Sequence, residues 1–285
     1  MSNIDISQAE RLDQYVARQL PTVSRAYAAK LVETGKVTVN GVVNSKSGYK
    51  LRASDTIEID HDPETMAQIP DIDLSIIYED DDCVVINKPA GILSHSKGTF
   101  NPEATVASWL ASHVVGLTGD RAGVVHRLDR ATSGVMICAK NPAASAWLQK
   151  QFSQRRVKKV YEAVVQGTFN TEHAVIDMPI ERNPKKPQTF RVGSNGKSAV
   201  TEYKVIEHNE QFSLVELSPL TGRTHQLRVH LENLGHPIVG DTFYGGPASD
   251  RLYLHAKSLE ITIPSRERKV FTVPVPGEFK TLAKP

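Results

Sequence analysis

Asp129 is the carboxylate with the most unusual surroundings in the sequence. Arg127 and Arg130 flank it, and its loop lies between two apolar runs, 124–125 and 135–139, which we predict to be strands. A cation within about 4–6 Å favours the charged form of a carboxyl by about 1–3 pKa units. We therefore expect Asp129 to stay ionised, which suits a nucleophile or a general base. In isolation, an Arg-x-Asp sequence more often forms a structural ion pair at a strand end.

Other chemistries find less support in the sequence. Glycoside hydrolysis normally uses two carboxylates, and the motif loops offer only Asp129 and Asp241. Neither a Gly-x-Gly-x-x-Gly sequence nor a Walker-type phosphate loop occurs, so we predict no nucleotide cofactor. His225 and His230 would lie about 140° apart around a helix. Paired-Cys and His-Glu-x-x-His spacings are missing, and we predict no metal site.

Composition indicates a globular protein. The 285 residues are 40% hydrophobic and 23% charged, enough for one large domain or two smaller ones. Because neither a long apolar run nor a signal peptide is visible, we expect a cytoplasmic protein without membrane contact. Cys83 and Cys138 lie in apolar runs and are predicted to be buried, unpaired residues.

Charge is distributed unevenly along the chain, although the net charge is only +2. Residues 61–82 contain eight acidic and no basic residues, whereas residues 150–197 contain ten Lys or Arg against four acids. This asymmetry is consistent with a polyanion bound on one face. A solvated charged loop is the alternative for the basic segment.

The first 60 residues predict two short helices followed by a small hairpin sheet. Apolar residues at helical spacing indicate a helix over 11–20 and another over 25–34, with Ser24 as N-cap. Alternating apolar residues around Asn40-Gly41, and again at 56–59, indicate the strands of the hairpin.

The rest of the chain predicts a larger domain. The acidic segment 61–74 contains two prolines and is interpreted as a linker between a domain at 1–60 and a domain at 75–285. Alternating and apolar runs predict strands, and two stretches have helical spacing. We expect strands at 76–78, 83–86, 160–165, 199–206 and 212–217, helices at 141–152 and 227–234, and a mobile basic loop at 181–197.

The loop at 126–134, His-Arg-Leu-Asp-Arg-Ala-Thr-Ser-Gly, resembles the central motif of the RluA/RluD group of pseudouridine synthases. Ala131 stands where most members carry an acidic residue. Further matching motifs extend the resemblance over most of the chain: Lys88-Pro-Ala-Gly91, Lys159-Val-Tyr161, Gly222-Arg-Thr-His-Gln-Leu-Arg228, 235–245 and 251–256.

This resemblance implies both a fold and a set of site residues. The fold is α+β, with a catalytic domain built on a mixed, mostly antiparallel sheet flanked by helices. Asp129 would be the catalytic aspartate, Tyr161 would lie against the target base, and Arg228, ahead of Arg223, would be held against Asp129. No cofactor is implied. The substrate-binding candidates are Arg127, Arg223, His225, Gln226 and Lys88, the last of which belongs to a mainly architectural element.

The first 60 residues resemble the RNA-binding domain named after ribosomal protein S-four, through Arg11-Leu12-Asp13, Ser24-Arg25, Leu31 and 35–41. In that case Arg25, Lys30 and Lys36 would face phosphates, because cations supply the sequence-independent part of RNA affinity. A helical cap with solvated basic residues is the alternative.

The resemblance predicts a monomeric enzyme that isomerises specific uridines of large-subunit ribosomal RNA to pseudouridine. A tRNA-directed synthase is one alternative. A catalytically silent RNA-binding or ribosome-assembly factor is the other, but it would have no need of Asp129, Tyr161 and Arg228 together.

Overall fold

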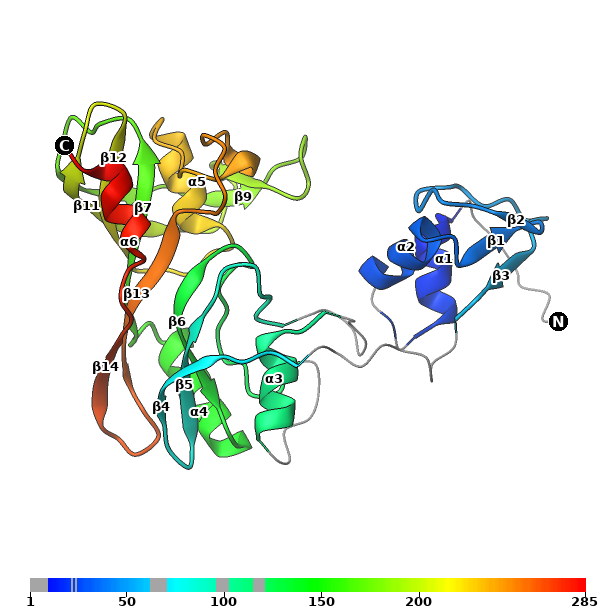
Figure 1. Ribbon diagram of the computed structural model, residues 1–285, viewed down its shortest axis with the longest axis horizontal. Coiled ribbons are helices and arrows are strands. Elements are labelled where there is room, and N and C mark those ends of the chain that lie inside the picture. The colour runs from blue at the N-terminus through cyan, green and yellow to red at the C-terminus, as the bar shows by residue number, and fades with distance from the viewer. Residues whose placement is uncertain (1–9, 22, 24, 62–70, 96–102, 115–120) are drawn as a thin grey trace.

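The chain forms two units, each with its own sheet and core (Figure 1). The computed structural model describes residues 10–285 except 22, 24, 62–70, 96–102 and 115–120. The predicted α+β fold, with a small N-terminal domain before a larger one, is confirmed. The domain boundaries stay predictions, since most of the expected linker lies outside the described residues, as does the expected N-cap Ser24.

Two helices and a three-stranded antiparallel sheet form the N-terminal unit. Its sheet has the order β2-β1-β3. Asn40 and Gly41 both have positive φ angles, 53° and 76°, which a two-residue hairpin turn with the twist of its strands requires. The predicted helices and hairpin are thus confirmed. The elements are α1 (Leu12–Gln19), α2 (Arg25–Glu33), β1 (Val37–Val39), β2 (Val42–Val43) and β3 (Ile57–Ile59).

One large sheet organises the second unit, in the order β4-β5-β6-β13-β7-β12-β11-β8, with β14 paired to β13. Strands β6 and β13 run parallel, and every other strand pair in the described part of this sheet is antiparallel. The sheet is therefore mixed and mostly antiparallel, as predicted. Its strands are β4 (Ser75–Glu79), β5 (Cys83–Lys88), β6 (Ser133–Ala139), β7 (Lys158–Gln166), β8 (His173–Asp177), β11 (Val200–His208), β12 (Phe212–Pro219), β13 (Leu254–Thr262) and β14 (Arg268–Thr272).

Helices cover both faces of the sheet. Every residue of β6 is buried, and its side chains alternate between two cores. Met136 packs in the core that contains Leu110 of α3, whereas Ile137 packs in the core that contains Leu148 of α4. Cys83 and Cys138 are buried and unpaired, as predicted. The helices are α3 (Val106–His113), α4 (Pro142–Ser153), α5 (Gln226–Asn233) and α6 (Gly277–Ala283), with a 3₁₀ helix η1 (Thr242–Tyr244).

Two local predictions were wrong. Residues 124–125 do not form a strand; Val124 makes a single bridge to Cys138 before the chain turns into the loop. The segment 181–197 is not simply a loop, because β9 (Ile180–Arg182) and β10 (Phe190–Val192) pair antiparallel within it. Its many Lys, Pro and Gly residues concealed two strands of only three residues each.

Gly134 fixes the end of the Asp129 loop against the sheet. It pairs with Ala256 where β6 runs parallel to β13, and its φ is +119°. A Cβ at this position would lie 2.2 Å from the carbonyl oxygen of Ala256, so only glycine allows the two backbones to approach so closely. Among the described residues, no helix has both the length and the apolar character that a membrane crossing requires.

Candidate active site

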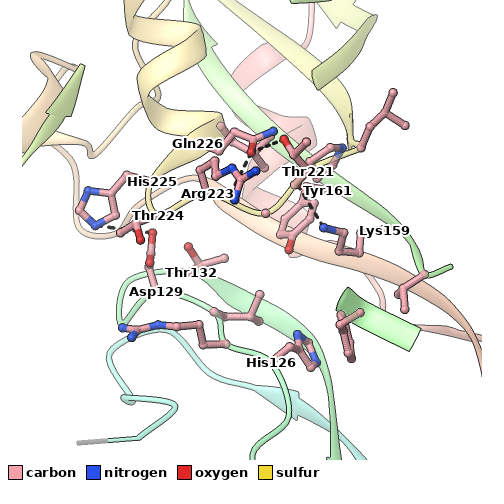
Figure 2. Close-up of a pocket in the computed structure, with 18 of the residues that line it drawn as sticks. His126, Asp129, Thr132, Lys159, Tyr161, Thr221, Arg223, Thr224, His225 and Gln226 are labelled. Atoms are coloured by element: carbon pink, nitrogen blue, oxygen red, sulfur yellow. Dashed lines mark hydrogen bonds and ion pairs between the residues drawn. The ribbon is translucent and has the colours of Figure 1, made fainter. Parts of the chain in front are cut away.

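The central loop faces a cavity of about 470 Å³, which is bounded on the other side by β7 and the start of α5 (Figure 2). Predicted site residues from three separate motifs meet there. Polar and charged side chains make up much of its wall: Arg127, Asp129, Lys159, Tyr161, Thr221, Arg223, His225, Gln226 and Arg228. The fold therefore brings together most of the residues that the sequence singled out.

The cations beside Asp129 are not its neighbours in sequence. Oδ2 of Asp129 lies 3.6 Å from Nη1 of Arg228 and 3.9 Å from Nε2 of His225. Arg130 instead pairs with Glu103 at 2.6 Å, and Arg127 lines the cavity without reaching ion-pair distance of Asp129. The expectation that Arg127 and Arg130 hold Asp129 ionised was therefore wrong, because their side chains leave the loop in other directions.

Arg228 is held in place by a second carboxylate. Its Nε and Nη2 atoms donate to Asp241 at 2.6 and 2.7 Å, and both side chains are almost completely buried. Burial opposes the charge of Arg228, but the hydrogen bonds and charges of Asp241 and then Asp129 outweigh it and raise the arginine pKa. Of the two candidate arginines, Arg228 is the one beside Asp129.

His225 sits between Asp129 and a buried tyrosine. Its Nδ1 atom lies 2.8 Å from the hydroxyl of Tyr244, and burial lowers its pKa against the opposing charge of Asp129. The residue immediately precedes α5 and has a left-handed backbone, with φ 56° and ψ 20°. Such a conformation is uncommon for any residue other than glycine and is enriched at functional sites.

Lys88 supports the loop and does not reach the cavity. Its side chain is fully buried, and Nζ donates to the carbonyl oxygens of Pro89, Ile92 and Arg130 at 2.9, 2.8 and 3.3 Å. Its inclusion among the substrate-binding candidates was therefore wrong. Ser94 acts similarly, because its hydroxyl donates to the carbonyl of Leu128 at 2.8 Å. These bonds fix the backbone on both sides of Asp129.

Gln226 lines the cavity and also supports the surrounding backbone. It is buried, and its amide donates to Val200 and Thr201 while accepting from Thr221 and the backbone N–H of Arg223. Every polar group of the side chain is thus used inside the protein. The Arg223 guanidinium lines the cavity and donates from Nε to the carbonyl of Ser198 at 2.9 Å.

Tyr161 and Lys159 project from β7 into the same cavity (Figure 2). Burial, and then the charge of Asp129, raise the pKa of Tyr161. Lys159 donates to the carbonyl of Thr221 at 3.3 Å, and burial lowers its pKa to about 8. Residues two apart on a strand share a face, which is why the Lys-x-Tyr spacing delivers both side chains here.

The basic candidates of the N-terminal unit lie on its surface but are not equivalent. Arg25 donates to Asp13 at 3.1 Å, and Lys36 pairs with Asp60 at 2.7 Å. Lys30 is exposed in the last turn of α2. Arg25 and Lys36 remain about half exposed, so their ion pairs leave N–H groups open to solvent.

Sequence reasoning missed Tyr244 and gave Asp241 no positioning part. Both belong to the segment after α5 that had been matched only as a motif, and a periodic pattern could not show that it folds back against Arg228. Lys159 could have been found from its spacing to Tyr161. Within the described residues, no group of three or more His, Cys, Asp or Glu is arranged to hold a metal ion.

Known proteins resemble this chain over nearly its whole length. The family model for RNA pseudouridylate synthase matches residues 82–233, and the model for the S4 domain matches residues 10–57. The ribosomal large subunit pseudouridine synthase D of Vibrio parahaemolyticus is 36% identical over 98% of this chain and 92% of its own. The protein of the same name from Borreliella burgdorferi is 38% identical over 95% of this chain and 88% of its own.

A solved structure agrees with these sequences. Human RNA Pseudouridylate Synthase Domain Containing 1 superposes with a TM-score of 0.63 and 32% identity, covering 76% of this chain and 91% of the human one. The matched region contains the Asp129 loop, β7 and α5, which together form the cavity. The chain therefore belongs to the RNA pseudouridine synthase family.

Proposed function

We propose that the protein converts uridines of large-subunit ribosomal RNA to pseudouridine, with Asp129 as the catalytic carboxylate and without a cofactor. The observation that carries this proposal is the placement of Asp129 beside Arg228 in a cavity that Tyr161 also lines. The names of the bacterial relatives favour ribosomal RNA of the large subunit as the substrate.

The reaction itself explains why one carboxylate suffices. The bond between C1′ and N1 of uridine breaks, a bond between C1′ and C5 forms, C5 loses its proton to solvent, and N1 gains one. Oxidation state does not change and no group is donated. An ionised Asp129 can serve as a nucleophile or remove a proton, and both routes use the same oxygen atoms.

The neighbouring side chains supply what this chemistry needs. Arg228 offers a fixed positive charge 3.6 Å from Asp129, which attracts the carboxylate and orients it. The Tyr161 ring provides an aromatic face for a uracil removed from its stack, and its raised pKa keeps the phenol protonated. Arg127 and Arg223 line the cavity and can contact the RNA backbone.

Tritium release from RNA labelled at C5 of uracil tests the proposal. Transcripts of large-subunit ribosomal RNA and of tRNA would be compared, with wild-type protein beside Asp129→Asn and the control Asp81→Asn, an exposed carboxylate in the turn before β5. We expect release from ribosomal RNA with wild type and Asp81→Asn. Tritium release by Asp129→Asn should be slower by about 10²- to 10⁴-fold or more, which is the usual size of an acid–base contribution to the rate. This variant should still bind RNA.

Each contrary result has a separate meaning. Release from tRNA alone would mean that the substrate is tRNA and not ribosomal RNA. A fully active Asp129→Asn would mean that Asp129 is not the catalytic carboxylate. If naked RNA is inert, the same assay on ribosomal particles of partly assembled large subunits decides whether the substrate is the RNA within a particle.

A further inference from the structure

A chain of polar contacts leads from the β9–β10 hairpin to Asp129. The backbone N–H of Phe190 donates to the Tyr244 hydroxyl at 3.0 Å, that hydroxyl lies 2.8 Å from Nδ1 of His225, and Nε2 of His225 faces Asp129 at 3.9 Å. We propose that this chain locks His225 in the tautomer that carries its proton on Nε2, which makes His225 a positioning residue for Asp129. The proposal rests on the proposed role of Asp129.

The number of protons on Tyr244 decides the tautomer. A phenol oxygen carries one proton, and the Phe190 N–H already donates to that oxygen. Burial raises the pKa of Tyr244, so the hydroxyl keeps its proton. Among the described residues, Nδ1 of His225 is the only acceptor within hydrogen-bond distance of this hydroxyl, so the phenol proton goes to Nδ1. A neutral imidazole whose Nδ1 accepts must have its N–H at Nε2.

The charges around His225 favour the same arrangement. Asp129, Arg228, Asp241 and Arg127 all act on the ring, and burial, the largest influence, lowers its pKa and keeps it neutral. In the opposite tautomer, the lone pair of Nε2 would point at the carboxylate of Asp129. Because that contact is repulsive, whereas an N–H facing a carboxylate is attractive, the field of the site and the Tyr244 hydrogen bond select the same form.

The backbone of His225 is held in a conformation that fixes the position of the ring. A left-handed conformation at a residue other than glycine is strained and persists only where the surrounding structure holds it in place. Here Val229 donates to the carbonyl of His225 at 2.9 Å, and Gln226 holds the preceding turn through its bonds to Thr221 and Arg223. The edge of the ring also meets Phe190, with centroids 5.6 Å apart.

Both contacts to Asp129 reach the same carboxylate oxygen. Arg228 and His225 each approach Oδ2, so Oδ1 is the oxygen left to meet the substrate. The distances of 3.6 and 3.9 Å exceed hydrogen-bond length, and such contacts commonly shorten only in the substrate complex. His225 would then keep the reactive oxygen pointed into the cavity, together with Arg228.

Nitrogen NMR of the full-length protein with ¹⁵N-labelled histidine tests the tautomer directly. His225 is assigned by the signal missing in His225→Gln. We expect wild type to show a protonated Nε2 and an unprotonated Nδ1. Tyr244→Phe keeps the ring that packs on Arg228 but lacks the hydroxyl, and should give a mixture of tautomers. Tyr203→Phe removes a hydroxyl that donates to the carbonyl of Thr171, and it should leave the His225 signals unchanged.

Two substitutions of His225 test positioning through activity. The amide nitrogen of glutamine can occupy the place of Nε2, whereas that of asparagine can occupy the place of Nδ1. We expect His225→Gln to lose less than 10-fold in kcat and His225→Asn at least 100-fold, with KM for RNA changing less than kcat. Asparagine adopts the left-handed backbone more readily than glutamine, so a purely structural role predicts the reverse order.

The possible failures can be told apart. A protonated Nδ1 in wild type, or a Tyr244→Phe spectrum identical to wild type, would overturn the tautomer lock. His225→Asn as active as His225→Gln would overturn the positioning role. Absence of tritium release from every RNA and ribosomal particle would instead overturn the proposed function, while the NMR result would still stand on its own.

Discussion

Arg228 and Asp241 form a buried bidentate ion pair that directs the third guanidinium nitrogen toward Asp129. Nε and Nη2 bind the two oxygens of Asp241, and Nη1 is left 3.6 Å from Asp129. The planar guanidinium has a rigid fork of donors, so fixing two of them fixes the third. The site therefore contains two carboxylates with different surroundings: one is buried and orients the arginine, and the other faces the cavity.

Asp241→Asn should show whether the two carboxylates have different functions. The amide can accept from one arginine nitrogen but carries no charge, so Arg228 should swing toward Asp129 and pair with it tightly. Loss of one partner of a buried pair commonly costs about 3–5 kcal/mol; with Asp129 nearby as a substitute, we expect the lower end of that range or less. We predict a fall in kcat of at least 10-fold, measured with tritium release, alongside urea unfolding.

Glu278→Gln is the matched control for that experiment. It breaks the pair between Glu278 and Arg251, in which the carboxylate is 45% exposed. Exposed pairs contribute about 0–1 kcal/mol, so stability should change little and kcat should not change. An Asp241→Asn enzyme with wild-type kcat would show that the orientation of Arg228 does not depend on Asp241.

The sequence predicted the elements of the fold better than their contacts. Local signals were sufficient for α1, α2 and the Asn40-Gly41 hairpin, because the helical period and the turn chemistry act within a few residues. The same holds for α4 and β5. The pairing of β6 with β13, 122 residues apart in the case of Ser133 and His255, has no local signal.

Predictions about the site were wrong where they depended on the direction in which a side chain points. Neighbouring positions suggested Arg127 and Arg130 as partners of Asp129, but consecutive side chains on a loop point different ways. Lys88 was expected to contact substrate because it is a charged residue in a motif, and the fold uses its donors to bind backbone carbonyls instead. Burial of a polar group cannot be read from its residue type.

Lys88→Met should destabilise the protein. The change removes the lysine donor from the carbonyls of Pro89 and Ile92, whereas the carbonyl of Arg130 keeps the N–H of Gly91. A carbonyl left unsatisfied away from water costs about 1–3 kcal/mol. Urea unfolding, with Lys280→Met on the exposed side of α6 as control, measures the difference. Because Arg130 is one of the three partners, kcat should fall as well, whereas Lys280→Met should leave both quantities unchanged.

The pH dependence of that difference provides a sharper check. Burial lowers the pKa of Lys88 from 10.5 to about 8. Between these values the unfolded chain binds more protons at this site, so the unfolding free energy of wild type rises with pH relative to Lys88→Met. The destabilisation measured at pH 9.5 should therefore exceed that at pH 7. Equal values would mean that the lysine is not desolvated.

Substitution of Lys30 should affect RNA binding alone, whereas substitution of Arg25 should affect both RNA binding and stability. Lys30→Ala should weaken RNA binding and reduce the salt slope of log K by about 0.7–0.9, the value for one phosphate contact. Arg25→Ala should do the same and also destabilise the N-terminal unit by about 0.2–1 kcal/mol, because its pair with Asp13 is lost. Lys30→Arg keeps the charge and serves as the control. A salt slope unchanged in Lys30→Ala would place this residue away from the RNA.

Lys159 should give RNA binding a dependence on pH. Burial lowers its pKa to about 8, so the cavity carries this positive charge below pH 8 and loses it above. A polyanion should therefore bind more weakly as the pH rises from 7 to 9. Filter binding at fixed ionic strength measures Kd for wild type, Lys159→Arg and Lys159→Met across this range.

The two variants distinguish the effect of the Lys159 charge on Kd from the effects of other groups that titrate in this range. Arginine stays protonated throughout, so Lys159→Arg should show a flatter dependence than wild type. Lys159→Met has no charge at any pH and should bind weakly with an equally flat profile. Lys88 titrates near the same pH but is present in all three proteins, so its effect cancels in the comparison. Parallel profiles for wild type and Lys159→Met would show that the Lys159 ammonium does not contribute to RNA binding.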